Sequence, residues 1–126
     1  MAMAGLWAGL DVWVVEGVFD LFALQWAVEG VVLAAETARI NQVQLEFLRR
    51  WCRGWVHVVF DNDKPGRQGV HGWVDRTGKR RPGAVDLLKR VGLKARHVPY
   101  QGKDPGEIWK SSGAQGLFQT FHEMRL

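Results

Sequence analysis

The sequence predicts an α/β fold in which a parallel sheet of about four strands is flanked by helices on both faces. Three observations support this prediction. Short apolar runs rich in β-branched residues recur along the chain, segments with apolar residues at helical spacing separate them, and glycines or acids mark their ends. Alternating strands and helices are typical of parallel sheets with right-handed crossovers, because each connecting helix packs against a face of the sheet.

The first half of the chain is expected to form two strands and two helices. Residues 12–15, Val-Trp-Val-Val, form the first strand, and the apolar residues that follow repeat at helical spacing until Gly30 ends the helix. Residues 31–34 form the second strand. From Thr37 a second amphipathic pattern continues to Gly54. Arginines lie in its last turn, where their positive charge interacts favourably with the helix dipole.

The second half resumes this pattern after one interruption. Residues 66–82 are rich in glycine and in basic residues, so we expect an irregular insertion with a hairpin somewhere in 72–79. Asp104 is followed by proline and, three residues on, by glutamate, which is typical of a helix start. The remaining expected elements are a strand at 55–60, a helix at 83–91, a strand at about 93–100 and an amphipathic helix in the tail.

Length and composition indicate one folded domain. With 126 residues, 47% of them apolar, and seven tryptophans, the chain can bury a core and is too apolar to be disordered. We expect residues 1–11 to be a lead-in and residues 12–126 to form the domain. The single cysteine, Cys52, excludes an internal disulfide and is expected to be a core residue at a helix end.

The start of the chain lacks the features of a secretory signal. Its first cation is Arg39, and no apolar run reaches the ~18 residues that a membrane span requires. We therefore expect a cytoplasmic protein with no membrane partner.

Acidic residues follow several of the predicted strands. Glu16 ends the first strand and Asp20 lies four residues on, Asp61 and Asp63 follow the third, and Asp104 precedes a helix. The carboxyl ends of parallel strands meet at one edge of a sheet, where ligands bind. Carboxylate oxygens are the ligands that Mg²⁺ prefers, so these residues predict a divalent-metal site. For Asp20 and Asp104 a helix-capping role is an open alternative.

These stretches resemble the three acidic motifs of the Toprim fold, a Rossmann-like fold that DnaG-type primases share with type IA and type II topoisomerases and several nucleases. The resemblance is closest to the primase branch and extends from residue 12 to about residue 109. Three motifs in this order, each at a strand–helix junction, are more specific than any one of them. The matching stretches are Glu16-Gly17-Val18-Phe19-Asp20, Asp61-Asn62-Asp63 and Gly102-Lys103-Asp104-Pro105-Gly106-Glu107.

The resemblance implies a catalytic role for Glu16, Asp61 and Asp63, which would also hold the metal together with Asp20 and Asp104. Glu16 would act as a third ligand or as a proton-transfer group. The implied metal is Mg²⁺, with Mn²⁺ as a substitute. Two features depart from the primase pattern: Gly106 stands where primases usually carry a second acid, and residues 66–82 separate the Asp-x-Asp motif from its helix.

Basic residues are concentrated beside the second acidic motif. Positions 64–81 contain six cationic residues and one acid, Asp75, together with the aromatic residue Trp73. This composition favours contact with a nucleic-acid backbone, with a solvated loop as the alternative. The candidate nucleic-acid-binding residues are Lys64, Arg67, Trp73, Arg76, Lys79, Arg80, Arg81 and Lys103.

The sequence therefore predicts an Mg²⁺-dependent nucleic-acid enzyme domain, most similar to the nucleotidyl-transfer domain of a primase acting on a single-stranded template. Its expected partners are DNA or RNA, nucleotide triphosphates, and a helicase, a zinc-binding protein or a primase subdomain. Two alternatives are open: a small free-standing Toprim nuclease that hydrolyses phosphodiesters, and a nucleic-acid-binding module without catalysis.

Overall fold

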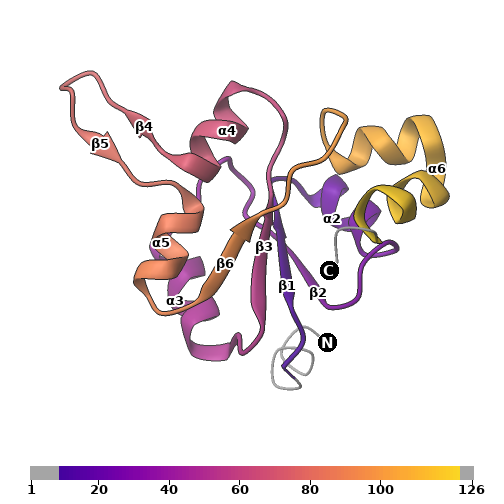
Figure 1. Ribbon diagram of the computed structural model, residues 1–126, viewed down its shortest axis with the longest axis horizontal. Helices are drawn as coiled ribbons and strands as arrows, with labels where there is room; N and C mark the ends of the chain where they lie inside the picture. Colours follow the sequence, from indigo (N-terminus) through magenta and orange to yellow (C-terminus); the bar gives the residue numbers. More distant parts are fainter. Residues whose placement is uncertain (1–8, 123–126) are drawn as a thin grey trace.

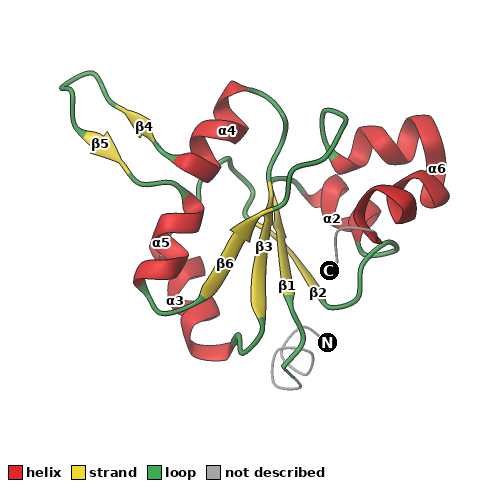
Figure 2. Ribbon diagram, in the orientation of Figure 1, coloured by secondary structure: helices red, strands yellow, loops and turns green. Residues whose placement is uncertain are grey.

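Four parallel strands form the centre of the computed structural model, which describes residues 9–122. The strand order is β2-β1-β3-β6, and each neighbouring pair is parallel (Figure 2). The predicted fold class is confirmed, because helices lie on both faces of this sheet (Figure 1). The strands are β1 (Val12–Val15), β2 (Val31–Ala34), β3 (Trp55–Val59) and β6 (Lys94–His97).

Two helical layers cover the sheet. Helices α3, α4 and α5 pack on one face, whereas α2 and α6 pack on the other. Side chains alternate between the faces, so that Val12 and Val14 of β1 reach the first layer and Trp13 and Val15 reach the second. The helices are α2 (Val18–Leu24), α3 (Gln42–Trp51), α4 (Lys64–His71), α5 (Ala84–Arg90) and α6 (Pro105–His122), and α6 is kinked at Gly113.

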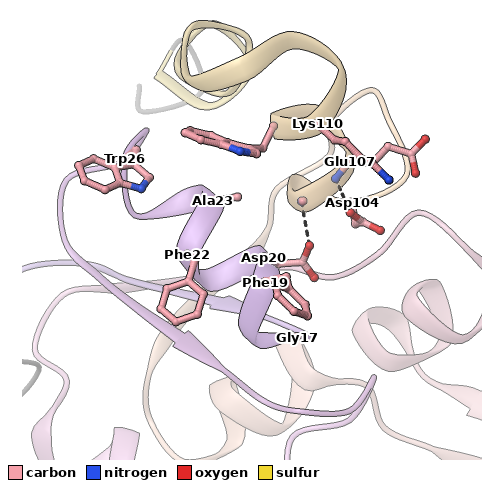
Figure 3. Close-up of a pocket in the computed structure, with 11 residues that line it drawn as sticks. Gly17, Phe19, Asp20, Phe22, Ala23, Trp26, Asp104, Glu107 and Lys110 are labelled. Carbon is pink, nitrogen blue, oxygen red and sulfur yellow. Dashed lines mark hydrogen bonds between the residues drawn. The ribbon is translucent and has the colours of Figure 1, made fainter.

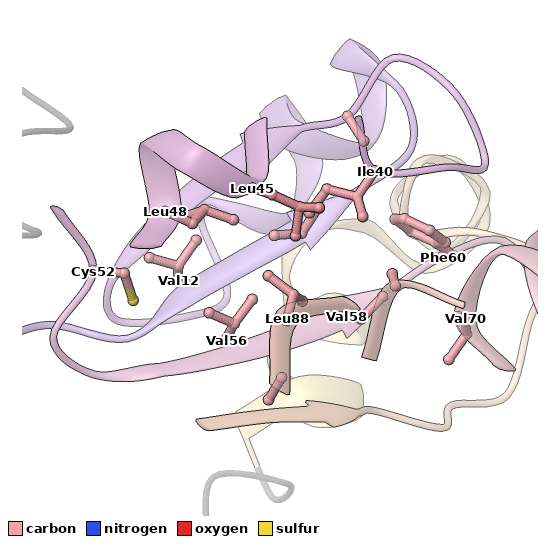
Figure 4. Close-up of a cluster of buried hydrophobic side chains, with 14 of the residues drawn as sticks. Val12, Ile40, Leu45, Leu48, Cys52, Val56, Val58, Phe60, Val70 and Leu88 are labelled. Atoms are coloured by element: carbon pink, nitrogen blue, oxygen red, sulfur yellow. The ribbon is translucent and has the colours of Figure 1, made fainter. Parts of the chain in front are cut away.

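The core beneath α3 and α5 is apolar and includes the single cysteine (Figure 4). Leu45 and Leu48 of α3 and Leu88 of α5 are buried against β1 and β3. Cys52 is the residue that ends α3, and it is buried, as expected. Burial raises the pKa of its thiol, which keeps it protonated.

Two of the predicted helices are shorter than expected. The helix expected from Thr37 begins at Gln42, because Asn41 forms a capping box with Gln44, with N–O distances of 2.8 and 2.9 Å. The helix expected to reach Gly30 ends at Leu24, where the chain continues through tight turns instead of α-helical hydrogen bonds.

The segment expected to be an irregular insertion, residues 66–82, begins with a regular helix. Helix α4 follows the Asp-x-Asp motif directly, since Asp63 caps its first turn. Its glycines permit close packing: a Cβ at Gly66 would lie 1.9 Å from the carbonyl oxygen of Asp61, and one at Gly69 would lie 1.8 Å from that of Ala38. Glycines that seemed to indicate a loop therefore allow this helix to approach the backbone beside it.

A short hairpin follows α4, as the sequence indicated, and reaches beyond residue 79. Strands β4 (Trp73–Val74) and β5 (Arg80–Arg81) are antiparallel, and the hairpin projects away from the sheet (Figure 1). Asp75 holds the turn together by accepting hydrogen bonds from the backbone N–H groups of Thr77 and Lys79.

A histidine is buried at the amino end of the sheet. The Nε2 atom of His57 lies 2.8 Å from Asp11 Oδ2, and its Nδ1 atom accepts a hydrogen bond of 2.8 Å from Arg96. Burial lowers the pKa of His57, so the ring is neutral at neutral pH. His57 is thus a packed core imidazole with charged neighbours.

No helix within residues 9–122 is long and apolar enough to cross a membrane.

Replacing Gly69 by alanine is expected to lower the thermal midpoint. The added Cβ would overlap the Ala38 carbonyl, and overpacking of about 1–3 kcal/mol outweighs the helix propensity gained. Circular dichroism melts would measure this, with Arg67→Ala as the control because Arg67 is exposed on the same helix. An unchanged midpoint for Gly69→Ala would contradict the close approach of α4 to residue 38.

Candidate metal centre

Four acidic positions meet at the carboxyl edge of the sheet. Glu16 follows β1 directly, and Asp61 comes two residues after β3. Asp20 lies one turn into α2, and Asp104 immediately precedes α6. The parallel strands therefore deliver these side chains to one place, as we predicted from their positions after the strands.

Three of these carboxylates are close enough to share one cation. One oxygen from each of Asp20, Asp61 and Asp104 lies within 4.8 Å of the other two. Asp20 is the most enclosed, with a relative exposure of 7%. Negative charges that are crowded and partly buried repel one another unless a proton or a cation compensates them.

The backbone at the start of α6 holds Asp20 in place. Its Oδ1 accepts a hydrogen bond of 2.9 Å from the N–H of Gly106 (Figure 3). A Cβ at position 106 would lie 3.1 Å from this oxygen and 3.3 Å from Asp104 Oδ1. The glycine that departs from the primase pattern therefore leaves room for the two aspartates.

Asp61 carries the unpaired acceptor atom of this cluster. Its Oδ1 is buried and has no hydrogen-bond partner among the described residues. Burial, followed by the nearby charges of Glu16, Asp20, Asp104 and Asp63, raises its pKa to about 7. A divalent cation would satisfy the unpaired oxygen and offset the repulsion, so the residues present fit a metal such as Mg²⁺.

Glu16 adjoins the three aspartates. Its Oε1 accepts a hydrogen bond of 3.1 Å from the N–H of Asp61, which fixes the two residues side by side. Burial and the charges of Asp63, Asp20 and Asp104 raise its pKa. Glu16 is therefore beside the cluster with an elevated proton affinity.

Asp63 caps the helix that follows the Asp-x-Asp motif. Its Oδ1 accepts a hydrogen bond of 2.8 Å from Gly66, and it is the N-cap of α4. Asp104 combines both alternatives, because it caps α6 through Glu107 at 2.7 Å and also belongs to the cluster. The structure thus groups Asp61 with Asp20 and Asp104, whereas the resemblance emphasised Glu16 and Asp63 as its partners. Whether each residue binds metal or acts in catalysis stays a prediction.

A polar side chain that the sequence analysis did not single out ties the two acidic loops together. Asn62 donates from its amide to the carbonyls of Tyr100 and Gly102, at 2.8 and 2.6 Å, and its N–H donates to Lys103. The hydroxyl of Tyr100 donates to the carbonyl of Phe60 at 3.0 Å. These bonds hold Asp104 against Asp61. The position of Asn62 inside the Asp-x-Asp motif was the only signal for this role.

The candidate nucleic-acid-binding residues do not all lie free in solvent. Arg76, Lys79 and Arg80 are exposed on the hairpin, but Arg81 pairs with Asp75 at 2.8 Å. Trp73 is half-buried, and a guanidinium group lies 4.2 Å above its ring centre. That guanidinium belongs to Arg39, outside the basic segment, and the contact fixes the base of the hairpin. Three further cations, Lys64, Arg67 and Lys103, are exposed near the acidic loops.

Comparison with known proteins gives structural matches only. No family model matches the chain, and no curated protein matches its sequence. The zinc-binding and RNA polymerase domains of the Aquifex aeolicus primase match with a TM-score of 0.63 and 23% identity over 94% of this chain and 28% of that chain. The RNA polymerase domain of Mycobacterium tuberculosis primase DnaG matches with a TM-score of 0.62 and 24% identity over 94% of this chain and 37% of that one.

These likenesses concern the fold. The chain shares its α/β architecture with part of two primase structures, and it spans about a third of their length. The acidic cluster must therefore carry the argument about chemistry.

Without metal, the protein is expected to lose stability as the pH rises from about 4 to about 7. The pKa of Asp61 is raised from 3.8 to about 7 in the folded state. The folded state therefore holds an extra proton in this interval, and its stabilising effect is lost as the pH passes the folded pKa. Thermal midpoints across this range, in the presence of a chelator, would measure the effect.

Asp61→Asn should flatten this pH dependence and raise the midpoint near pH 8 by roughly 4 °C, or ~1 kcal/mol. The substitution removes a buried charge from a crowded cluster. Asp86→Asn is the matched control, because Asp86 is an exposed acid on α5. A lower midpoint for Asp61→Asn at this pH would mean that the carboxylate is needed for folding.

Proposed function

We propose that the chain is an Mg²⁺-dependent nucleotidyltransferase domain that extends nucleic acid on a single-stranded template, as a primase does. The observation that carries the proposal is the convergence of Asp20, Asp61 and Asp104 around an unpaired buried carboxylate oxygen. The likeness of the fold to two primase structures supports the same reading. Nucleotidyl transfer needs a metal ion to neutralise charge on the reacting phosphate oxygens, and a carboxylate cluster can hold such an ion.

In this proposal the acids have two tasks, metal binding and proton transfer. Asp20, Asp61 and Asp104 would hold Mg²⁺, which when bound neutralises charge on the phosphate oxygens of a nucleotide triphosphate. Asn62 links the loop that carries Asp61 to the loop that carries Asp104 and so holds these two aspartates in position. Glu16, with its raised pKa and its bond to the Asp61 backbone, would accept the proton of the attacking hydroxyl.

The hairpin would bind the nucleic-acid backbone. Arg76, Lys79 and Arg80 are exposed there, and backbone contact requires only a set of cations near phosphates. The ion pair with Asp75 gives Arg81 a supporting role in the hairpin itself. The remaining parts of a primase, such as a zinc-binding or helicase partner, would position the template.

A denaturing gel tests the proposal directly. The protein would be incubated with end-labelled single-stranded DNA or RNA, all nucleotide triphosphates, and Mg²⁺ or Mn²⁺. Extended products are expected. They should fall by more than about 100-fold in Asp61→Asn, because even an outer partner of a metal ligand is worth about 10–100-fold. Asp86→Asn should match the wild type.

Other outcomes point to the alternative functions. Shortened products that disappear in Asp61→Asn would identify a nuclease, because the same cation chemistry supports hydrolysis. Binding without any change in length would indicate a non-catalytic module. Products that persist in Asp61→Asn would show that the acidic cluster is not the reaction centre.

The triple substitution of Arg76, Lys79 and Arg80 by alanine is expected to weaken binding of a single-stranded oligonucleotide. Each lost phosphate contact lowers the slope of log affinity against log salt by about 0.7, so three contacts lower it by about 2. Fluorescence anisotropy at several salt concentrations measures both quantities. The control replaces Lys89, Arg90 and Lys94, exposed cations on α5 and β6. Equal slopes for the two triple variants would show that the hairpin is a solvated loop.

A further inference from the structure

A row of exposed aromatic side chains lies beside the metal centre. Phe19 and Phe22 of α2, and Trp26 just after it, have relative exposures of 80%, 54% and 68%. Phe19 and Phe22, three residues apart, share one side of α2, and Trp26 lies in the turn that follows the helix. Trp109 of α6 is 43% exposed. Groups this large and apolar are costly to leave in water, so they mark a binding surface.

All four aromatic residues line one cavity of about 690 Å³ between α2 and the start of α6. Asp20 and Asp104 line the same cavity, and Figure 3 shows Asp20 pointing from α2 toward the start of α6. An occupant would therefore touch aromatic rings at one end and the acidic cluster at the other.

The lining favours flat rings over the side chains of a protein partner. Apart from the methyl group of Ala23, every apolar side chain in this cavity is aromatic. A second groove of this molecule, beneath α3, is lined by aliphatic residues such as Leu33, Ile40 and Val43, as a docked apolar helix would require. Exposed aromatic rings are the surfaces on which the bases of single strands stack.

We propose that Phe19, Phe22 and Trp26, together with Trp109, form a base-stacking subsite for single-stranded nucleic acid. This inference rests on the proposed function, because it places a phosphate of the same strand at the metal centre. Phe19 and Trp26 are seven residue steps apart, so about 10 Å of helix α2 and of the turn after it separates them, which suits successive stacked bases of a strand better than one free nucleotide.

The charge of the cavity makes this binding depend on a divalent cation. Asp20, Asp104 and Glu107 line the cavity with Lys110 as the one cation among its lining residues. A strand phosphate is repelled by these acids until a metal ion compensates them. The rings supply affinity that does not depend on base identity, because every base has a π face.

The test measures binding of a labelled oligonucleotide of about twelve nucleotides to the full chain, by fluorescence anisotropy with Ca²⁺ or Mg²⁺. Trp26→Ala and Phe22→Ala should each weaken binding by about 5- to 100-fold. Trp26→Phe should retain most of the affinity, whereas Trp26→Leu should lose it. Trp55→Ala is the matched control, because Trp55 is a half-exposed tryptophan at the opposite end of the sheet.

A strand with abasic sites supplies an independent readout. Wild type should bind it at least as weakly as Trp26→Ala binds the intact strand, because the variant loses one ring whereas the abasic strand loses the bases that stack on all of them. Equal binding of intact and abasic strands would overturn the stacking role. So would full affinity in Trp26→Leu, which would indicate apolar packing alone.

The remaining outcomes separate this subsite from the proposed function. If wild type binds the strand and Trp26→Ala binds it equally well, only the subsite is overturned. If wild type binds no strand with either cation, the proposed function and the subsite fail together. If Trp26→Ala weakens binding of a nucleotide triphosphate but leaves strand binding unchanged, the rings bind a free nucleotide. That result would overturn the proposal that they bind a strand. Self-association of wild type that Trp26→Ala abolishes, with strand binding unchanged, would assign the surface to a protein interface.

Discussion

The repulsion among Asp20, Asp61 and Asp104 is the constraint around which this edge of the protein is built. Hydrogen bonds offset part of it, through the N–H of Gly106 to Asp20 and the N–H of Asp61 to Glu16. The repulsion that remains contributes to the raised pKa of Asp61, whose Oδ1 atom is also unpaired. Three carboxylates held together at this cost could bind a cation, which would offset the repulsion that remains.

The strands could be predicted to within a residue or two at most ends because their signal is local. A buried parallel strand needs only a short β-branched apolar run, and residues 12–15 and 31–34 supply one each. Helix α4 could not be predicted in this way, because Gly66 and Gly69 are unfavourable within a helix. Their value lies in contacts with Asp61 and Ala38, and those contacts depend on the tertiary structure.

The location of the site was predictable, whereas the grouping of its residues was not. Acids after strands must meet at one edge, so the sequence could place Glu16, Asp20, Asp61 and Asp104 together. Asp63 was not recognised as the cap of α4, because the glycines that follow led us to expect a loop there. Nor could it reveal Asn62 as the bridge between loops, because its partners are backbone carbonyls that any residue carries.

The hairpin is fastened at one end only. Arg39 covers the ring of Trp73 at its base, whereas a side chain at Gly78, near the tip, would meet nothing within 4 Å. The arm itself is short: its two strands have two residues each, and Asp75 links them through Lys79 and Arg81. The tip of the arm, which has few contacts, can therefore move while the contacts at its root leave the spacing of the carboxylates undisturbed.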